Sequence, residues 1–257
     1  MSGGEDKMQR GRHSGQAAPA SAGESLPSKG RETSPSARAD AEIADFVRRM
    51  RELAPAPAGG RGRLVFAMDA TMSRQPTWDM ALALQGEMFR AVKAVGGLDV
   101  QLMYFRGAGE CRASRWVSDA DALASLMVRV ACAGGYTQIG KVLGHVRAEA
   151  KNKPVNALVY VGDCMEEEID DVCGRAGELA LLGVPVFLFQ EGSDARAQKA
   201  FREIARLTKG AYCRFDAGSA TQLRDLLSAV AVYAAGGRKA LEAHAGRGAR
   251  LLLKQLT

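Results

Sequence analysis

Five oxygen-bearing side chains between positions 69 and 163 have the residue types of a site for a hard metal ion. They are Asp69, Thr71, Ser73, Thr137 and Asp163. Carboxylate and hydroxyl oxygens are the ligands that Mg²⁺ prefers, and Mg²⁺ usually keeps part of its water shell. The two carboxylates would balance one divalent cation. These residue types therefore predict a Mg²⁺ or Mn²⁺ site with at least one coordination position open to solvent.

Apolar runs in the sequence indicate how these residues could meet. Residues 64–68 form such a run directly before Asp69, and residues 157–161 form another just before Asp163. Short apolar runs near glycines predict buried strands. Thr137 stands at the start of a helical stretch, after Gly134 and Gly135. Because the loops after parallel strands meet at one edge of a sheet, we expect the five residues to lie close together.

Strand and helix patterns alternate from residue 63 onward. The predicted strands cover residues 63–68, 99–105, 112–117, 156–161, 185–190 and 211–215. The predicted helices cover residues 76–95, 119–131, 138–151, 165–182, 194–208 and 219–235. This alternation predicts a three-layer α/β fold, Rossmann-like, with a mostly parallel central sheet between helices. Gly183 and Gly210 are predicted to end helices in a left-handed conformation.

The chain resembles the von Willebrand factor A (VWA) family over residues 62–235. The resemblance is carried by the D-x-[ST]-x-S string at Asp69, Thr71 and Ser73, by Thr137 at a helix start, and by Asp163 after an apolar strand. In this family the corresponding residues form the metal-ion-dependent adhesion site. The family also implies six strands, of which the one around residues 112–117 is an antiparallel edge strand.

The resemblance implies a function as well as a fold. A partner carboxylate, from Asp or Glu, would complete the metal shell, and Asp163 would act partly through water. Helix N-termini near the loops should also favour an anion. The expected activity is that of a non-enzymatic protein-binding scaffold or adaptor, whose partner could be an AAA-type ATPase or an assembly complex. Thr71 and Cys164 depart from the family, which more often has Ser and Gly there.

Other interpretations of the same residues remain open. The hydroxyls and carboxylates could simply cap helices. The acidic run at residues 166–171 is expected to be the first turn of a helix, stabilised by its dipole, although it could also form an acidic rim. Cys164 could have a lowered pKa beside a metal or be a buried inert thiol.

An enzyme is not expected. None of the three histidines, His13, His145 and His244, lies beside a plausible nucleophile at a strand end, which disfavours a catalytic triad. The glycines at 107 and 109 are expected to form a turn rather than a dinucleotide site. A metal-dependent hydrolase stays as the alternative, and only residues 166–168 could supply its general base.

Composition sets the remaining expectations. Residues 1–40 are predicted to be a disordered tail, residues 41–53 an amphipathic helix that caps the domain or binds a partner, and residues 54–61 a linker. The net charge is +6, but the basic extension at residues 236–257 holds +4 of it, so nucleic-acid binding is expected only as an alternative through that extension. The five cysteines are odd in number and form no CxxC pair, and no apolar run is long enough to span a membrane. These features predict a cytoplasmic protein without structural zinc or a membrane partner.

Overall fold

The computed structural model describes residues 41, 44–45, 61–93, 95–215 and 219–253. The chain divides into two units, residues 1–33 and residues 34–257, and every described residue belongs to the second. The predicted tail lies outside the described residues. So does most of the predicted helix at 41–53, of which Ala41, Ala44 and Asp45 are helical, and all of the linker except Arg61.

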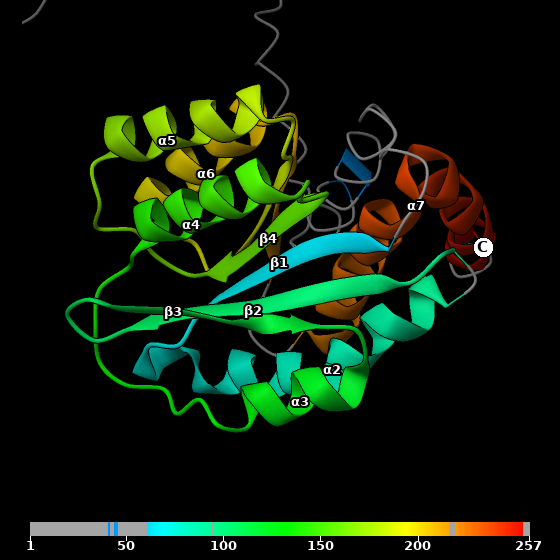
Figure 1. Ribbon diagram of the computed structural model, residues 1–257, viewed down its shortest axis with the longest axis horizontal. Coiled ribbons are helices and arrows are strands. Elements are labelled where there is room, and N and C mark those ends of the chain that lie inside the picture. The colour runs from blue at the N-terminus through cyan, green and yellow to red at the C-terminus, as the bar shows by residue number, and fades with distance from the viewer. Residues whose placement is uncertain (1–40, 42–43, 46–60, 94, 216–218, 254–257) are drawn as a thin grey trace, which may run out of the picture. The chain divides into compact units, whose positions relative to one another are not determined.

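A six-stranded sheet forms the centre of the domain (Figure 1). Its strands are β1 (Gly62–Asp69), β2 (Leu98–Arg106), β3 (Glu110–Val117), β4 (Ala157–Gly162), β5 (Val186–Glu191) and β6 (Ala211–Phe215). Their order in the sheet is β3-β2-β1-β4-β5-β6. All neighbouring pairs are parallel except β2 and β3, so the predicted antiparallel edge strand is confirmed.

Helices cover both faces of this sheet. They are η1 (Met72–Arg74), α2 (Gln75–Val92), α3 (Ala120–Met127), α4 (Ile139–Asn152), α5 (Ile169–Leu181), α6 (Ala195–Leu207) and α7 (Ala220–Leu253). Figure 1 shows α4, α5 and α6 on one face and α2, α3 and α7 on the other. The predicted three-layer α/β fold is therefore confirmed.

Two apolar cores, one on each face, hold the layers together. Trp78 of α2 and Leu227 of α7 pack in one core, while Val142 of α4 and Phe201 of α6 pack in the other. The two cores divide the strands residue by residue, because successive side chains of a strand point to opposite faces. Both faces are thus buried, which explains why the parallel strands are mostly apolar.

Three local predictions were wrong. α5 begins at Ile169 rather than at residue 165, because the chain runs on as a loop after β4. α7 continues to Leu253, well beyond residue 235, with a kink at Gly237 where φ is 65°. Lys209, not Gly210, has the left-handed conformation after α6. Gly210 is needed for another reason, since a Cβ there would lie 1.8 Å from the carbonyl oxygen of Val186.

No helix in the described part of the chain is both long enough and apolar enough to cross a bilayer.

Candidate metal site

The two predicted carboxylates lie on neighbouring strands of the sheet. Asp69 is the last residue of β1, and Asp163 directly follows β4. β1 and β4 pair in parallel, with Met68 opposite Val161. From β1 the chain builds the sheet outward through β2 and β3, and then returns to the other side of β1 with β4. Such a switch in strand order opens a crevice at the carboxyl ends of the strands, where α/β proteins bind ligands.

The loop after β1 folds its polar side chains around this crevice. The backbone N–H of Thr71 donates to Asp69 Oδ1 at 2.7 Å, and Ser73 Oγ donates to Asp163 Oδ2 at 3.4 Å. The Thr71 and Ser73 hydroxyl oxygens are 3.3 Å apart. Either hydroxyl can be the donor of that contact. Contacts within the chain therefore connect Thr71 to Ser73 and Ser73 to Asp163.

Thr137 reaches the same crevice through a loop that is held against β2. Gly107 N–H donates to the Gly134 carbonyl at 3.0 Å, and Tyr136 N–H donates to the Gly107 carbonyl at 3.2 Å. A Cβ on Gly135 would lie 2.1 Å from the Gly107 nitrogen, so this close approach requires glycine. Gly135 thus has a structural reason that the sequence alone did not reveal.

These loops enclose a cavity of about 230 Å³. It is lined by Asp69, Thr71, Met72, Ser73, Gly134, Gly135, Thr137, Cys164 and Glu166. The structure therefore brings four of the five predicted metal residues to one cavity. Asp163 does not line the cavity, but its carboxylate accepts from Ser73, which does.

The side chains at this cavity have the chemistry that a cation site needs. Asp69 is only 1% exposed, and its Oδ2 atom has no hydrogen-bond partner; the buried Oδ1 of Asp163 has none either. A buried carboxylate oxygen without a donor is costly, which a bound cation would relieve. The pKa of Asp69 is raised to about 6, mainly by burial; the hydrogen bonds from Thr71 oppose this shift, and the Asp163 charge adds to it. The residues present therefore fit a divalent cation.

Arg74 and Glu191 complete the polar network of the site, although neither was among the predicted site residues. Arg74 Nε lies 3.2 Å from Asp163 Oδ2, and the Arg74 guanidinium also pairs with Glu191 at the end of β5. Thr77 donates its hydroxyl to the same Glu191 carboxylate. Glu191 is buried, so Arg74 is its compensating charge. Arg74 follows Ser73 directly in the sequence, and that proximity was the only available signal.

Three consecutive glutamates after β4 have three different environments. Glu166 accepts from both the N–H and the hydroxyl of Thr137, at 3.0 and 2.6 Å. Glu167 accepts the N–H groups of Ile139 and Gly140 and so caps the N-terminus of α4. Glu168 is exposed and pairs with Arg196. The expectation that they form the first turn of α5 was wrong, and only residues 170 and 171 of the acidic run do so.

The ionisation of these groups follows from their contacts. Burial raises the pKa of Glu166, but the hydrogen bonds from Thr137 outweigh it and hold that pKa below its usual value. Burial raises the pKa of Glu167 despite its bonds to Gly140 and Ile139. Because these carboxylates already occupy the positive end of α4, that helix is not available to attract an outside anion.

The thiol of Cys164 is not activated. Its Sγ donates to Glu166 Oε1 at 3.4 Å. Burial raises its pKa, and the negative charges of Asp163 and Glu166 act in the same direction. The direction of this shift favours the protonated, inert thiol over the alternative of a lowered pKa. No disulfide joins any of the five cysteines, all of which lie in the described residues.

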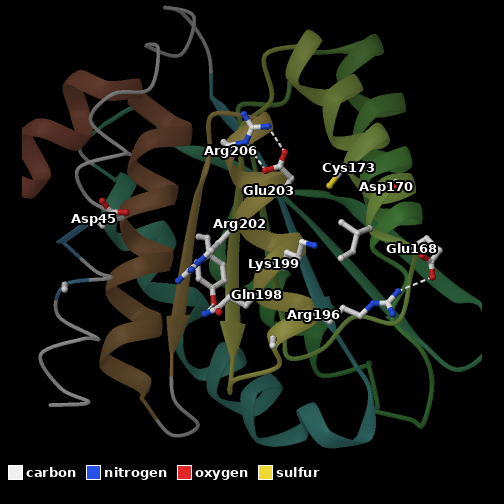
Figure 2. Close-up of a pocket in the computed structure, with 14 residues that line it drawn as sticks. Asp45, Glu168, Asp170, Cys173, Arg196, Gln198, Lys199, Arg202, Glu203 and Arg206 are labelled. Atoms are coloured by element: carbon white, nitrogen blue, oxygen red, sulfur yellow. Dashed lines mark hydrogen bonds and ion pairs between the residues drawn. The ribbon is translucent and has the colours of Figure 1, made fainter. Parts of the chain in front are cut away.

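A second, larger cavity of about 1350 Å³ lies against α5, α6 and β6 (Figure 2). Both basic and acidic side chains line it, and Figure 2 shows the Arg196–Glu168 and Arg206–Glu203 pairs as dashed lines. Arg202 lies over the ring of Tyr212, 5.2 Å from its centre. None of the five predicted metal residues lines this cavity. Within the described residues no group of three or more His, Cys, Asp or Glu side chains is placed to hold a metal. A cation in the smaller cavity would therefore depend on the hydroxyl oxygens of Thr71, Ser73 and Thr137 as well.

Comparison with known proteins supports the fold. No protein-family model matches the sequence, and no curated protein is significantly similar to it. Solved structures do match. A von Willebrand factor type A protein from Catenulispora acidiphila is 15% identical with a TM-score of 0.55, over 68% of this chain and 43% of that one. The SpRpn10 VWA domain is 12% identical with a TM-score of 0.51, over 65% and 94%.

A third structure carries a metal. Proximal thread matrix protein 1 from the mussel byssus, with a zinc-occupied MIDAS motif, is 14% identical with a TM-score of 0.53, over 67% of this chain and 46% of that chain. This chain therefore spans less than half the length of the first and third of these proteins. Identities this low concern the fold alone. The chain has the fold of a von Willebrand factor A domain.

Proposed function

We propose that this protein is a divalent-metal-dependent protein-binding module in which Asp69, Thr71, Ser73, Thr137 and Asp163 hold Mg²⁺ or Mn²⁺. The observation that carries the proposal is the buried Oδ2 atom of Asp69, which has no hydrogen-bond donor. Asp69 lines one cavity together with the hydroxyl-bearing residues Thr71, Ser73 and Thr137. A bound cation would attract a carboxylate from outside the chain. Such a module acts as a scaffold or adaptor rather than as an enzyme.

The local charge describes the partner that would fit. Asp69, Asp163, Glu166 and Glu191 carry four formal negative charges, and Arg74 carries one positive charge. A divalent cation leaves one negative charge uncompensated. A partner carboxylate should therefore be surrounded by basic residues, which would compensate this remaining negative charge. An AAA-type ATPase or an assembly complex remains a possible source of such a surface.

Calorimetric titration with Mg²⁺ and with Mn²⁺ tests the metal site. We expect weak binding to the full chain and none to Asp69→Ala, because Asp69 supplies the open carboxylate oxygen. Thermal unfolding should show that the variant is folded. A wild-type protein that binds neither ion would contradict the proposal.

Partner binding needs a separate experiment. Affinity capture with the full chain, in Mg²⁺ and in EDTA, should recover proteins only with Mg²⁺ and only with wild type. A recovered protein should then be purified, and its surface Asp and Glu residues replaced one at a time. We expect one replacement to abolish the Mg²⁺-dependent complex. Binding that is equal in EDTA would argue against a metal-bridged interface.

A metal-dependent hydrolase is the second candidate, favoured by the presence of Glu166 at the cavity. A general base must be free to take a proton from water. Both oxygens of Glu166 already accept hydrogen bonds, one from Thr137 and the other from Cys164. This engagement favours the binding module. Metal-dependent phosphoesterase turnover that is lost in Asp69→Ala would favour the enzyme.

We also propose a cytoplasmic setting. The support is chemical: no disulfide joins any of the five cysteines, and reducing compartments keep cysteines in the thiol state.

A further inference from the structure

Glu166 and Thr137 form a closed hydrogen-bonded pair at the cavity. The Thr137 hydroxyl donates to Glu166 Oε2 at 2.6 Å, and the Thr137 N–H donates to the same oxygen at 3.0 Å. In return, the Glu166 N–H donates to the Thr137 hydroxyl oxygen at 3.2 Å. The two residues are far apart in sequence and come from different loops. The pair therefore fixes both the position and the rotation of the Thr137 side chain.

Counting protons and lone pairs shows what this pair leaves for the cavity. A threonine hydroxyl has one proton and two lone pairs. The proton goes to the Glu166 carboxylate, and one lone pair accepts the Glu166 N–H. One lone pair remains, and Thr137 lines the cavity. Toward the cavity Thr137 is thus an acceptor only, which suits a cation and not an anion.

Both oxygens of the Glu166 carboxylate accept hydrogen bonds within the chain. Its Oε2 accepts from two donors of Thr137, and its Oε1 accepts from the Cys164 thiol. Asp69, in contrast, is only 1% exposed, lines the same cavity and keeps one carboxylate oxygen without a donor. Asp69 is therefore suited to contact a cation directly, whereas Glu166 is suited to act on a neighbouring ligand.

We propose that Glu166 is a positioning residue of the cation site: it holds the Thr137 hydroxyl proton away from the cavity and so presents a Thr137 lone pair to Mg²⁺ or Mn²⁺. This inference rests on the proposed function, because it requires that a cation binds. Outer residues that hydrogen-bond a metal ligand orient it and increase its basicity. Glu166 does both for Thr137.

Mn²⁺ titration of the full chain, followed by calorimetry and by water-proton relaxation, tests the proposal. Glu166→Ala removes the acceptor and the charge, and we expect Mn²⁺ affinity to fall by about 10- to 100-fold. Water relaxation should detect an additional water on the ion, since Thr137 is no longer held as a ligand. Glu166→Gln keeps an acceptor oxygen for Thr137 and should recover part of the affinity.

Glu168 offers a matched control. It belongs to the same acidic run, its side chain is 80% exposed, and it pairs with Arg196 (Figure 2). It does not line the site cavity. Glu168→Ala makes the same charge change and should leave Mn²⁺ affinity nearly unchanged. An equal loss in Glu168→Ala and Glu166→Ala would mean that only the overall charge matters, and would overturn the proposal.

A double-mutant cycle tests whether Glu166 acts through Thr137. In a Thr137→Val background the hydroxyl is already absent, so adding Glu166→Ala should cost little more. In a Thr137→Ser background the full effect should persist. Additive losses with Thr137→Val would refute the positioning role. Wild-type protein that binds no Mn²⁺ would refute the proposed function itself, so the two failures are distinguishable.

Discussion

At the scale of single residues, the site is a balance of buried charges. Asp69 is buried without a full set of donors, whereas Asp163 and Glu191 share Arg74. Without a cation, Asp69 should therefore reduce stability, and Arg74 should increase it. Each of these effects can be measured separately.

Asp69→Asn should stabilise the metal-free domain at neutral pH. Burial raises the pKa of Asp69 to about 6 from 3.8, so the folded state retains this proton to higher pH than the unfolded state. Stability should accordingly fall as pH rises from 4 to 6 and then stay low. Removing the charge should recover about 1–3 kcal/mol at pH 7.5 and almost nothing at pH 4.

Urea unfolding of wild type and Asp69→Asn in EDTA, at both pH values, measures this difference. Adding Mg²⁺ should reduce the difference at pH 7.5, since only wild type is expected to bind it. A difference that is the same at pH 4 and pH 7.5 would show that ionisation of Asp69 is not its cause.

Arg74→Gln should destabilise the domain by about 3–5 kcal/mol, because it leaves the buried Glu191 carboxylate without a charge partner. Adding Glu191→Gln should restore most of this loss, since no buried charge then remains at that position. Urea unfolding of the two single variants and the double variant measures the coupling. Additive costs would contradict the pairing of Arg74 with Glu191.

At the scale of elements, the site depends on how loops dock on strand ends. The loop before α4 reaches the site by packing against Gly107, at the end of β2, and the close approach occurs at Gly135. α4 is capped across the gap by Glu167, from the loop that follows β4. The position of Thr137 is thus set by two other segments of the chain.

Gly135→Ala should displace this loop. The new methyl group would lie 2.1 Å from a backbone nitrogen, so the loop must move, at a cost of about 1–3 kcal/mol. Mg²⁺ binding should weaken as Thr137 shifts. Gly134→Ala is the matched control, because a Cβ there has open space and its φ is not positive. Thermal unfolding and calorimetry of both variants test this; equal effects would refute the steric argument.

At the scale of the whole molecule, charge is concentrated at the C-terminus. Residues 244–257 hold three basic residues and no acidic one. A truncation that tests this charge must keep Leu241, which is buried in the core. Removal of residues 238–257 would also damage packing. A truncation after Ala243 retains Leu241.

Full-length protein should bind a short DNA duplex only weakly at about 0.15 M salt, and the truncation should abolish that binding. The reason is that phosphate contacts need basic residues, and removal of residues 244–257 lowers the net charge of the chain from +6 to +3. Fluorescence anisotropy at several salt concentrations measures it. Tight binding that survives the truncation would favour the nucleic-acid interpretation over the protein-binding module.

The sequence by itself determined the sheet and the meeting of its carboxylates. Apolar runs in alternation with amphipathic segments predicted all six strands, and an aspartate after a buried strand must lie at the edge of the sheet. The expected proximity of Asp69 and Asp163 followed from the meeting of strand-end loops at one edge, and the structure places them at the ends of the paired strands β1 and β4. Whether these residues bind a metal stays a prediction.

Only the tertiary structure decided the contacts between loops. Arg74 reaches Glu191, Glu166 reaches Thr137, and Glu167 caps a helix that precedes it in the chain. Periodicity reports which face of an element is buried, because that depends on residues three or four apart in a helix and two apart in a strand. It carries no information on the path of an irregular loop. Which polar side chains meet across such loops is therefore determined only when the packed strands bring the loops together.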